Sequence, residues 1–250
     1  MAVIIERIRA RRHAGWALAL LALLSAGSVP AAPLLLDSGA RQVTLLELFT
    51  SQGCSSCPPA ERWLNRLVDD ADLWTEIVPL AFHVDYWDYI GWQDPFAAAA
   101  YGERQRDYAR AGRARTVYTP GLFANGREWR GWTFGLGPRR SDREPGSLVA
   151  AIDGDRLTAT YPAAGRSLEL HVALLGSGIE TAVERGENRG RTLAQEFVVL
   201  AHSIHVSDNG QWAVELPRAD AGQVQRYGIA LWVSTADNPA PLQATGTWLP

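Results

Sequence analysis

The chain of 250 residues contains two cysteines, Cys54 and Cys57, separated by two serines. In oxidising compartments a cysteine pair most often forms a structural disulfide. A bridge between residues this close in sequence closes almost no loop, so it removes little entropy from the unfolded chain. A thiol at the start of a helix has a lowered pKa and reacts more readily. The spacing therefore favours a redox-active pair, with an inert disulfide as the alternative.

The residues around the pair predict a strand, a tight turn and a helix. Residues 43–49 form an apolar run interrupted by Glu47, which is typical of a buried strand. Pro58 directly follows Cys57 and suits the first turn of a helix. Apolar residues then recur at helical spacing up to about residue 70. In this arrangement Cys54 would be the nucleophile and Cys57 would resolve a mixed disulfide.

Further elements follow along the N-terminal half. The apolar run 77–84 predicts a second buried strand, parallel to the first and reached through the helix. A helix is expected from Asp94 onward. The Asn125-Gly126 pair after Thr119-Pro120 predicts a β-hairpin, and residues 148–152 are predicted as a short helix.

This order of elements resembles the thioredoxin fold over residues 43–153. More closely, the runs ELFTSQGCSSCPPAE, FHVDYWDYIGWQDPFA and RGENRGRTL resemble a family of secreted bacterial proteins of unknown function that carry a thioredoxin-like domain. The resemblance implies an α/β thioredoxin-like domain, with Pro120 as a cis-proline beside the redox pair. It also implies that Thr119 contacts the substrate backbone. Glu47 either exchanges a proton with Cys57, as a buried acid does in thioredoxins, or points to a strand edge and is solvated or paired with an arginine. Gly53 and Ser55-Ser56 depart from the Trp and Gly-Pro of thioredoxins, which leaves the direction of electron flow open.

His83 supports an alternative interpretation. It ends the second predicted strand and, with Cys54 and Cys57, could bind copper or zinc, because thiolate and imidazole suit both metals. Some exported thioredoxin-like copper chaperones combine a cysteine pair with a distal histidine, although three residues separate their cysteines. Trp87 belongs to an aromatic group that either walls a peptide groove or packs in the core. His202 and His205 lie at odd spacing in extended sequence, which argues against a joint metal site.

The C-terminal half has a different pattern. Short extended runs separated by turn signals predict a small all-β antiparallel sandwich. We place the boundary between the thioredoxin-like domain, residues 32–154, and the β-sandwich domain, residues 155–250, near Gly154. The charged turn 185–190 is expected either to dock the second domain on the first, to contact a partner, or to be a plain hairpin loop.

Residues 1–31 have the features of a secretory signal peptide. Four arginines precede an apolar run, and small residues follow it. The apolar run is shorter than the 20 or so residues that span a bilayer, so no membrane span is expected after cleavage. The net charge of −3 gives no reason to expect nucleic acid as a partner.

The sequence thus predicts a periplasmic or secreted thiol–disulfide oxidoreductase that acts on protein thiols or disulfides of the cell envelope. It would need a redox partner protein and no cofactor beyond its own disulfide. A copper or zinc carrier and a non-catalytic interaction module remain as alternatives.

Overall fold

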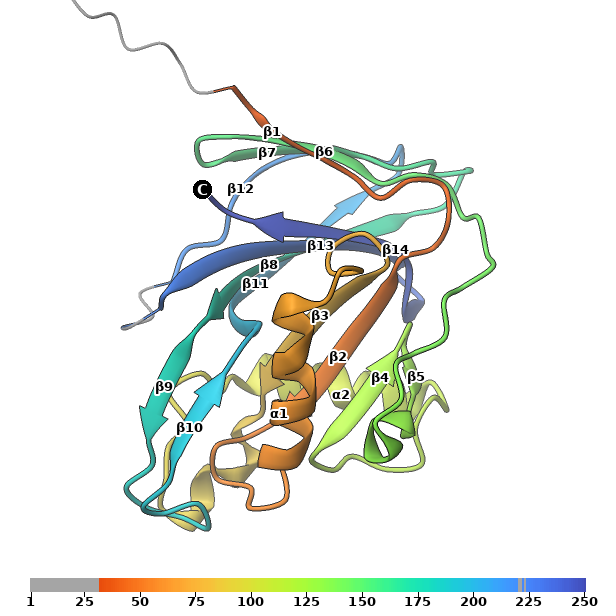
Figure 1. The fold of residues 1–250 in the computed structure, drawn as a ribbon. Coiled ribbons are helices and arrows are strands. Elements are labelled where there is room, and N and C mark those ends of the chain that lie inside the picture. Colours follow the sequence, from red (N-terminus) through yellow and green to blue (C-terminus); the bar gives the residue numbers. More distant parts are fainter. Residues whose placement is uncertain (1–31, 220–221, 223) are drawn as a thin grey trace, which may run out of the picture. The chain divides into compact units, whose positions relative to one another are not determined.

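The structure is a computed structural model that describes residues 32–219, 222 and 224–250 (Figure 1). The predicted signal peptide lies outside the described residues. Residues 32–250 form one compact unit. No helix of the described part is long and apolar enough to cross a membrane. The α-helices are α1 (Pro58–Asn65) and α2 (Ala99–Arg110), and short 3₁₀ helices cover Arg66–Asp69, Asp85–Ile90 and Gly131–Phe134.

Two sheets carry most of the chain. The first five strands are β1 (Leu34–Asp37), β2 (Thr44–Thr50), β3 (Ile77–His83), β4 (Gly121–Ala124) and β5 (Arg127–Glu128). They are followed by β6 (Val149–Asp153), β7 (Arg156–Thr160), β8 (Leu168–Ser177), β9 (Ile179–Ala182) and β10 (Thr192–Gln195). The last four are β11 (Val198–Ser207), β12 (Gln211–Glu215), β13 (Arg226–Thr235) and β14 (Asn238–Trp248).

The larger sheet is eight-stranded and mixed, with the order β14-β13-β8-β11-β3-β2-β4-β5. Strands β2 and β3 are parallel and connected through α1, and Thr50 pairs with His83 at their carboxyl ends. Strand β11 joins β3 in parallel at a single position, Val198 opposite Ala81. Every other pair in this sheet is antiparallel.

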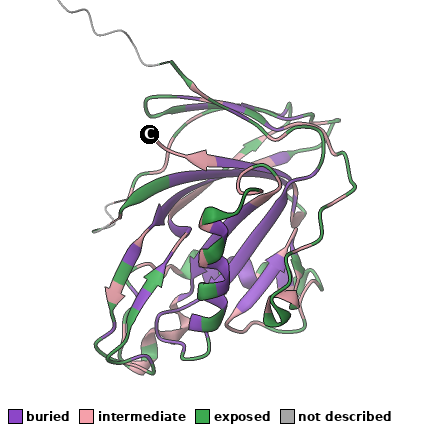
Figure 2. Cartoon of the chain, viewed as in Figure 1, coloured by how far each residue is buried: buried purple, intermediate pink, exposed green. Residues whose placement is uncertain are grey.

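The two faces of this sheet are covered by different elements. Leu46 and Leu48 of β2 face α1 and pack against its Trp63 and Leu64. Residues at alternate positions, such as Phe49, point to the opposite face, where α2 supplies Tyr101 and Tyr108. Burial on both sides explains the largely apolar sequences of β2 and β3. Figure 2 shows these strands as buried, apart from the start of β3.

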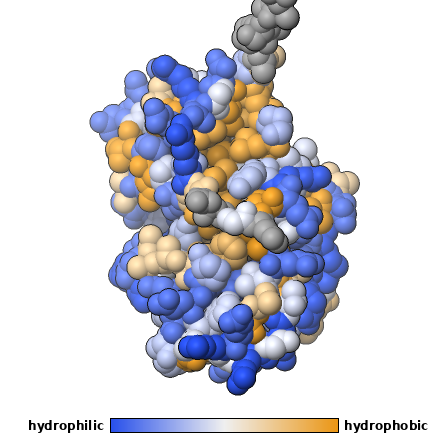
Figure 3. All heavy atoms as spheres, turned by 90° about the vertical axis from the view of Figure 1, so that its left-hand side faces the viewer, coloured by the Kyte–Doolittle hydropathy of each residue, from blue (hydrophilic) through white to orange (hydrophobic). Residues whose placement is uncertain are grey.

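A second, four-stranded sheet has the order β1-β6-β7-β12 and is antiparallel. Its inner side chains, including Leu157 and Trp212, pack against Leu170, Val172 and Leu231 of the large sheet. Hydrophobic residues gather in the upper part of the face shown in Figure 3, where the four-stranded sheet lies over the larger one. The remaining pair, β9 and β10, forms a separate hairpin.

The predicted fold class is wrong. The chain does not form an α/β thioredoxin-like domain followed by a small β-sandwich; it is mostly β-structure arranged in a mixed sheet and an antiparallel sheet. Strands from both sides of Gly154 contribute to each of the two sheets. The reason lies in β8 and β13, which are apolar and buried on both faces. Such strands need cover on two sides, and they obtain it by continuing the sheet that begins with β2 and β3.

Two local predictions also need correction. Residues 149–153 form strand β6 and not a helix, because Ala150 and Ile152 alternate with exposed positions and face the core. Strand β14 was not predicted, and it contains Pro239 and Pro241. It lies at the edge of the sheet, where a missing N–H donor is tolerated.

Candidate functional site

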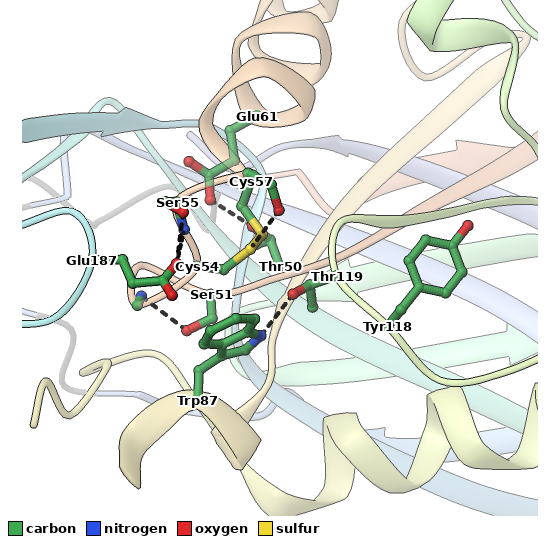
Figure 4. Close-up of a disulfide and its surroundings, with 12 residues drawn as sticks. Thr50, Ser51, Cys54, Ser55, Cys57, Glu61, Trp87, Tyr118, Thr119 and Glu187 are labelled. Atoms are coloured by element: carbon green, nitrogen blue, oxygen red, sulfur yellow. Dashed lines mark hydrogen bonds between the residues drawn. A yellow bond between two sulfur atoms is a disulfide. The ribbon is translucent and has the colours of Figure 1, made fainter. Parts of the chain in front are cut away.

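Cys54 and Cys57 form a disulfide where the β2–α1 turn enters α1 (Figure 4). Cys57 immediately precedes α1, and its carbonyl accepts bonds from the backbone N–H groups of Ala60 and Glu61. Both cysteines are completely buried, whereas Ser55 and Ser56 between them are exposed. The disulfide therefore lies just beneath the surface, at the positive end of the helix dipole.

Gly53 allows the turn to pass close to the 3₁₀ helix Asp85–Ile90. A Cβ atom at this position would come within 3.2 Å of Ile90 Cδ1 and 3.3 Å of Trp87 Cβ. This close approach gives a steric reason for glycine where thioredoxins carry a tryptophan.

Glu61 is a buried carboxyl group beside the disulfide. It lies four residues after Cys57, on the same face of α1, and is 4% exposed. Thr50 donates a hydrogen bond of 2.6 Å to Oε1, and Oε2 has no hydrogen bond to a described residue (Figure 4). Burial raises the pKa of Glu61, against the weaker lowering effects of His83 and Thr50. A carboxyl group of this kind can exchange a proton with a neighbouring thiolate.

His83 and Asp94 extend this group beneath Thr50. His83 Nδ1 lies 2.7 Å from Asp94 Oδ2, both side chains are fully buried, and His83 Nε2 has no partner among the described residues. Burial lowers the pKa of His83, but Asp94 and Glu61 outweigh this, so that the pKa is raised. The disulfide thus lies above a buried cluster of two carboxyl groups and one imidazole.

Glutamine side chains connect the parts of this cluster. Gln52 Nε2 donates to Gln195 Oε1 at 2.8 Å, while Gln195 Nε2 lies 3.4 Å from Glu61 Oε1. The backbone N–H of Gln52 donates to Asp94 Oδ2 at 2.8 Å, and Trp92 Nε1 donates to Gln52 Oε1. The turn that carries the cysteines is therefore tied to the cluster through both its main chain and its side chains.

Thr119 and Trp87 lie on the other side of the disulfide. The Thr119-Pro120 peptide bond is cis, as the resemblance implied. Trp87 Nε1 donates to Thr119 Oγ1 at 2.7 Å (Figure 4). The structure thus brings the predicted substrate-binding residues together beside Cys54 and Cys57.

The β9–β10 turn covers the exposed side of the disulfide loop. Glu187 Oε2 accepts hydrogen bonds from Ser55 N at 3.0 Å and from Ser55 Oγ at 2.6 Å (Figure 4). Asn188 is fully buried, and its Nδ2 donates to the carbonyls of Gln52 and Cys54, both at 2.9 Å. This is the charged turn 185–190 of the sequence. It is the loop of the β9–β10 hairpin, and it packs against the loop that carries the disulfide.

The prediction that Glu47 exchanges a proton with Cys57 does not fit the contacts of this side chain. It points to the α2 face of the sheet, away from Glu61 and Thr50, which lie on the α1 side. Arg104 Nε donates to Glu47 Oε1 at 2.6 Å, and Tyr108 Oη donates to Glu47 Oε2 at 2.5 Å. Glu47 is thus one partner of a buried ion pair, and the carboxyl group beside Cys57 is Glu61.

A metal centre of Cys54, Cys57 and His83 does not fit the observed contacts. The two sulfur atoms are joined to each other in a disulfide, so neither is a free thiolate ligand. Among the described residues there is no group of three or more His, Cys, Asp or Glu side chains that could hold a metal ion.

Reasoning from the sequence missed Glu61 and Asp94 as parts of the site, and it singled out the covering turn without placing it at the disulfide. The spacing of Glu61 from Cys57 was a usable signal, because residues four apart share a helix face. Asp94 and Asn188 carry no such signal, because tertiary contacts bring them to the site.

Together these features define a class of mixed-sheet protein with a buried disulfide at a helix start and a carboxyl group beneath it. Residues 45–234 match the family described as "Protein of unknown function (DUF1223)", and the chain belongs to this family. No curated protein matches the chain.

Two solved structures are similar to it. An X-ray structure of protein AGR_C_4864 from Agrobacterium tumefaciens is 26% identical, with a TM-score of 0.57, and the match covers 83% of this chain and 94% of that one. HBP35 of Porphyromonas gingivalis is 15% identical, with a TM-score of 0.53, and the match covers 85% of this chain and 76% of that one. The second likeness concerns the fold alone.

Proposed function

We propose that this protein is a thiol–disulfide oxidoreductase that exchanges its Cys54–Cys57 disulfide with thiols of other proteins in the cell envelope. The observation that carries this proposal is the buried carboxyl group of Glu61 on the same helix face as Cys57. An inert disulfide has no need of a buried carboxyl group whose hydrogen-bond partners among the described residues, Thr50 and Gln195, are neutral, and such a group costs stability when it ionises.

The exchange conserves atoms and electrons. A substrate thiolate attacks Sγ of Cys54, a mixed disulfide forms, and the electron pair of the broken Cys54–Cys57 bond goes to Sγ of Cys57. Protonated Glu61 gives its proton to that thiolate. A second substrate thiol, as its thiolate, then attacks the substrate sulfur of the mixed disulfide and releases Cys54. The substrate has been oxidised and the cysteine pair reduced; a redox partner protein reoxidises it.

The direction of attack follows from the contacts of the two cysteines. Cys57 is held next to the first turn of α1 and the Glu61 carboxyl group, whereas Cys54 belongs to the turn and lies on the side of Trp87 and Thr119 (Figure 4). A substrate chain that approaches beside Thr119 therefore reaches Cys54 first.

An envelope location rests on the N-terminal sequence. The arginine-rich start and short apolar run of residues 1–31 support export and cleavage. N-terminal sequencing of the protein recovered from the periplasm tests this. A new N-terminus close to residue 32 would support export, and an intact Met1 in the cytosol would exclude it.

The decisive experiment measures the reduction potential of the pair and traps the intermediate. We expect a potential between about −120 and −270 mV, the range of exchange catalysts. Cys57→Ser should accumulate a mixed disulfide with an oxidised peptide, because its Cys54 thiolate attacks one sulfur of the peptide disulfide, releases the other as a thiolate, and no Cys57 thiol is left to resolve the product. Cys54→Ser, the matched control, should not accumulate one.

Two results would contradict the proposal. A potential below about −300 mV together with slow exchange would identify a structural disulfide. Equal trapping by the two single variants would remove the assignment of Cys54 as the attacked sulfur.

Stoichiometric copper or zinc uptake by the reduced protein, abolished by His83→Ala, would favour the function of a metal carrier instead.

A further inference from the structure

A cavity of about 740 Å³ lies on the α2 face of the large sheet, opposite the face that carries Glu61 and α1. Helix α2 forms one wall along its length, and β8, β11, the end of β13 and the start of β14 form the others. The residues that define its chemistry are His171, His202, Arg104 and Glu169. None of them belongs to the disulfide site.

The floor of the cavity is a pair of hydrogen-bonded imidazoles that lie on an indole. His171 Nδ1 and His202 Nε2 are 3.1 Å apart, and the planes of the two rings differ by 8°. Both rings lie nearly parallel to Trp232, with centroids at 4.7 and 5.1 Å. The pairing is a product of the fold, because it joins residues of β8 and β11 across the sheet.

The hydrogen bonds fix the proton positions in this pair. His171 Nε2 lies 2.9 Å from Ser234 Oγ and 3.7 Å from Glu169 Oε2, and Ser234 Oγ donates toward the same carboxylate. A carboxylate only accepts, so Nε2 of His171 carries the proton and Nδ1 accepts from His202. His202 Nε2 is then the donor, which leaves its Nδ1 with a free lone pair.

Both rings are neutral. Burial lowers the pKa of His171, and Arg104 lowers it further. The same two causes lower the pKa of His202 to about 3. Nδ1 of His202 has no hydrogen bond to a described residue, and it is not one of the fully buried side-chain atoms that lack a partner. Since His202 lines the cavity, this nitrogen presents its lone pair to it.

The charges around the cavity favour a cation. Arg104 is held by Glu47 and Tyr108, and Arg110 by Glu103 and Asp107, so neither guanidinium is free for an anion. Glu169 has a quarter of its side chain exposed and makes no ion pair with an arginine of the described residues. The carboxylates that line the cavity are Glu103, Asp107, Glu169 and Asp237.

We propose that this cavity binds an organic cation, a guanidinium group, whose N–H donors reach Nδ1 of His202 at one end of the imidazole pair and the carboxylate of Glu169 at the other. The free lone pair requires a donor, and the unpaired carboxylate selects a positively charged one. A metal ion lacks a sufficient ligand set here, because the described residues contain no group of three suitable side chains.

The test uses the oxidised full chain, labelled with ¹⁵N, and n-butylguanidinium as the probe. Its neutral counterpart of the same shape is n-butylurea. We expect saturable binding of the guanidinium that shifts the Nδ1 resonance of His202, and binding of the urea at least about tenfold weaker. Glu169→Gln should weaken guanidinium binding about tenfold and leave urea binding unchanged.

Two further variants separate binding from folding. His202→Phe keeps a ring on Trp232 but has no lone pair, and it should abolish the binding. His205→Gln alters a half-buried histidine of the same strand whose Nε2 contacts Ser203, and it should bind like the unaltered chain. Equal binding of guanidinium and urea, a preference for acetate, tighter binding of zinc chloride, or no binding at all would each overturn the proposal.

Discussion

Histidines lie on both faces of the large sheet, and their surroundings shift their pKa values in opposite directions. On the α1 face, His83 is flanked by Asp94 and Glu61, and its pKa is raised. On the α2 face, His171 and His202 lie near Arg104, and their pKa values are lowered. Burial lowers the pKa of all three, so the sign is decided by the neighbouring charge.

The buried carboxyl groups of the two faces differ in the same way. Glu61 on the α1 face can exchange a proton, whereas Glu47 on the α2 face stabilises the fold through an ion pair. The α1 face places Glu61 beside a bond that needs a proton when it breaks. On the α2 face, Glu47 and Arg104 form an ion pair closed by Tyr108, which leaves neither charge available. A buried carboxyl group is therefore informative about function only when its cationic partner has been checked.

Breaking the ion pair on the α2 face should have the largest effect. Arg104→Met leaves the carboxylate of Glu47 buried without a cation, which typically costs about 3 to 5 kcal/mol of unfolding free energy. Urea denaturation of the oxidised protein measures this. The double variant Glu47→Leu with Arg104→Met should recover most of the loss, because no lone charge remains. A single variant as stable as the starting protein would contradict the assignment of a structural ion pair.

Glu61→Gln, the corresponding change on the α1 face, should slow disulfide exchange without lowering the unfolding free energy. Without the carboxylic acid, we expect disulfide exchange to slow about 100-fold, the lower end of the usual contribution of a positioned acid. The unfolding free energy should stay equal or rise, because a raised pKa means that ionised Glu61 destabilises the fold at neutral pH.

Stopped-flow reduction by a dithiol peptide across a pH series measures this effect. The starting protein should lose rate as the pH rises through the raised pKa of Glu61, and the variant should lack that step. Unchanged kinetics, or a loss of stability comparable to that of Arg104→Met, would refute the distinction between the two faces.

The site was only partly predictable from the sequence for a physical reason. Cys54, Cys57 and Pro58 are adjacent in the chain, and their local geometry follows from the turn and the helix start. The partners of Glu47 lie 57 and 61 residues away on α2, so only the packed structure reveals that this carboxyl group is neutralised. The fold class failed in the same way, because the path of β8 and β11 into the sheet of β3 is a long-range pairing.

The two histidine groups should shape the pH dependence of stability on opposite sides of pH 6.5. The lowered pKa of His202 gives stability that is present above about pH 6.5 and is lost as the pH falls toward its folded pKa of about 3. The raised pKa of His83 gives stability that is present below about pH 6.5 and is lost as the pH rises through its folded pKa.

Each histidine can change the unfolding free energy by up to about 1.4 kcal/mol per pH unit within its window. Urea denaturation between pH 4.5 and 8.5 gives the unfolding free energy as a function of pH. This free energy should change less steeply below about pH 6.5 for His202→Phe, and less steeply above about pH 6.5 for His83→Asn, than for the starting protein. Identical slopes in both variants would mean that neighbouring charges do not distinguish the two faces.

Glu187→Gln should give the smallest effect, because it weakens only the surface part of the cover on the disulfide. Glu187 is exposed and holds Ser55 through two hydrogen bonds, while the buried Asn188 still anchors the turn to Gln52 and Cys54. We expect reduction of the disulfide by dithiothreitol to accelerate about two- to fivefold, as suits the loss of a weak surface contact. Glu184→Gln, a change of the exposed residue just before this turn, should leave the rate unaltered. If both variants react at the starting rate, the turn is not what limits access to Cys54, and the approach beside Trp87 and Thr119 must already be open.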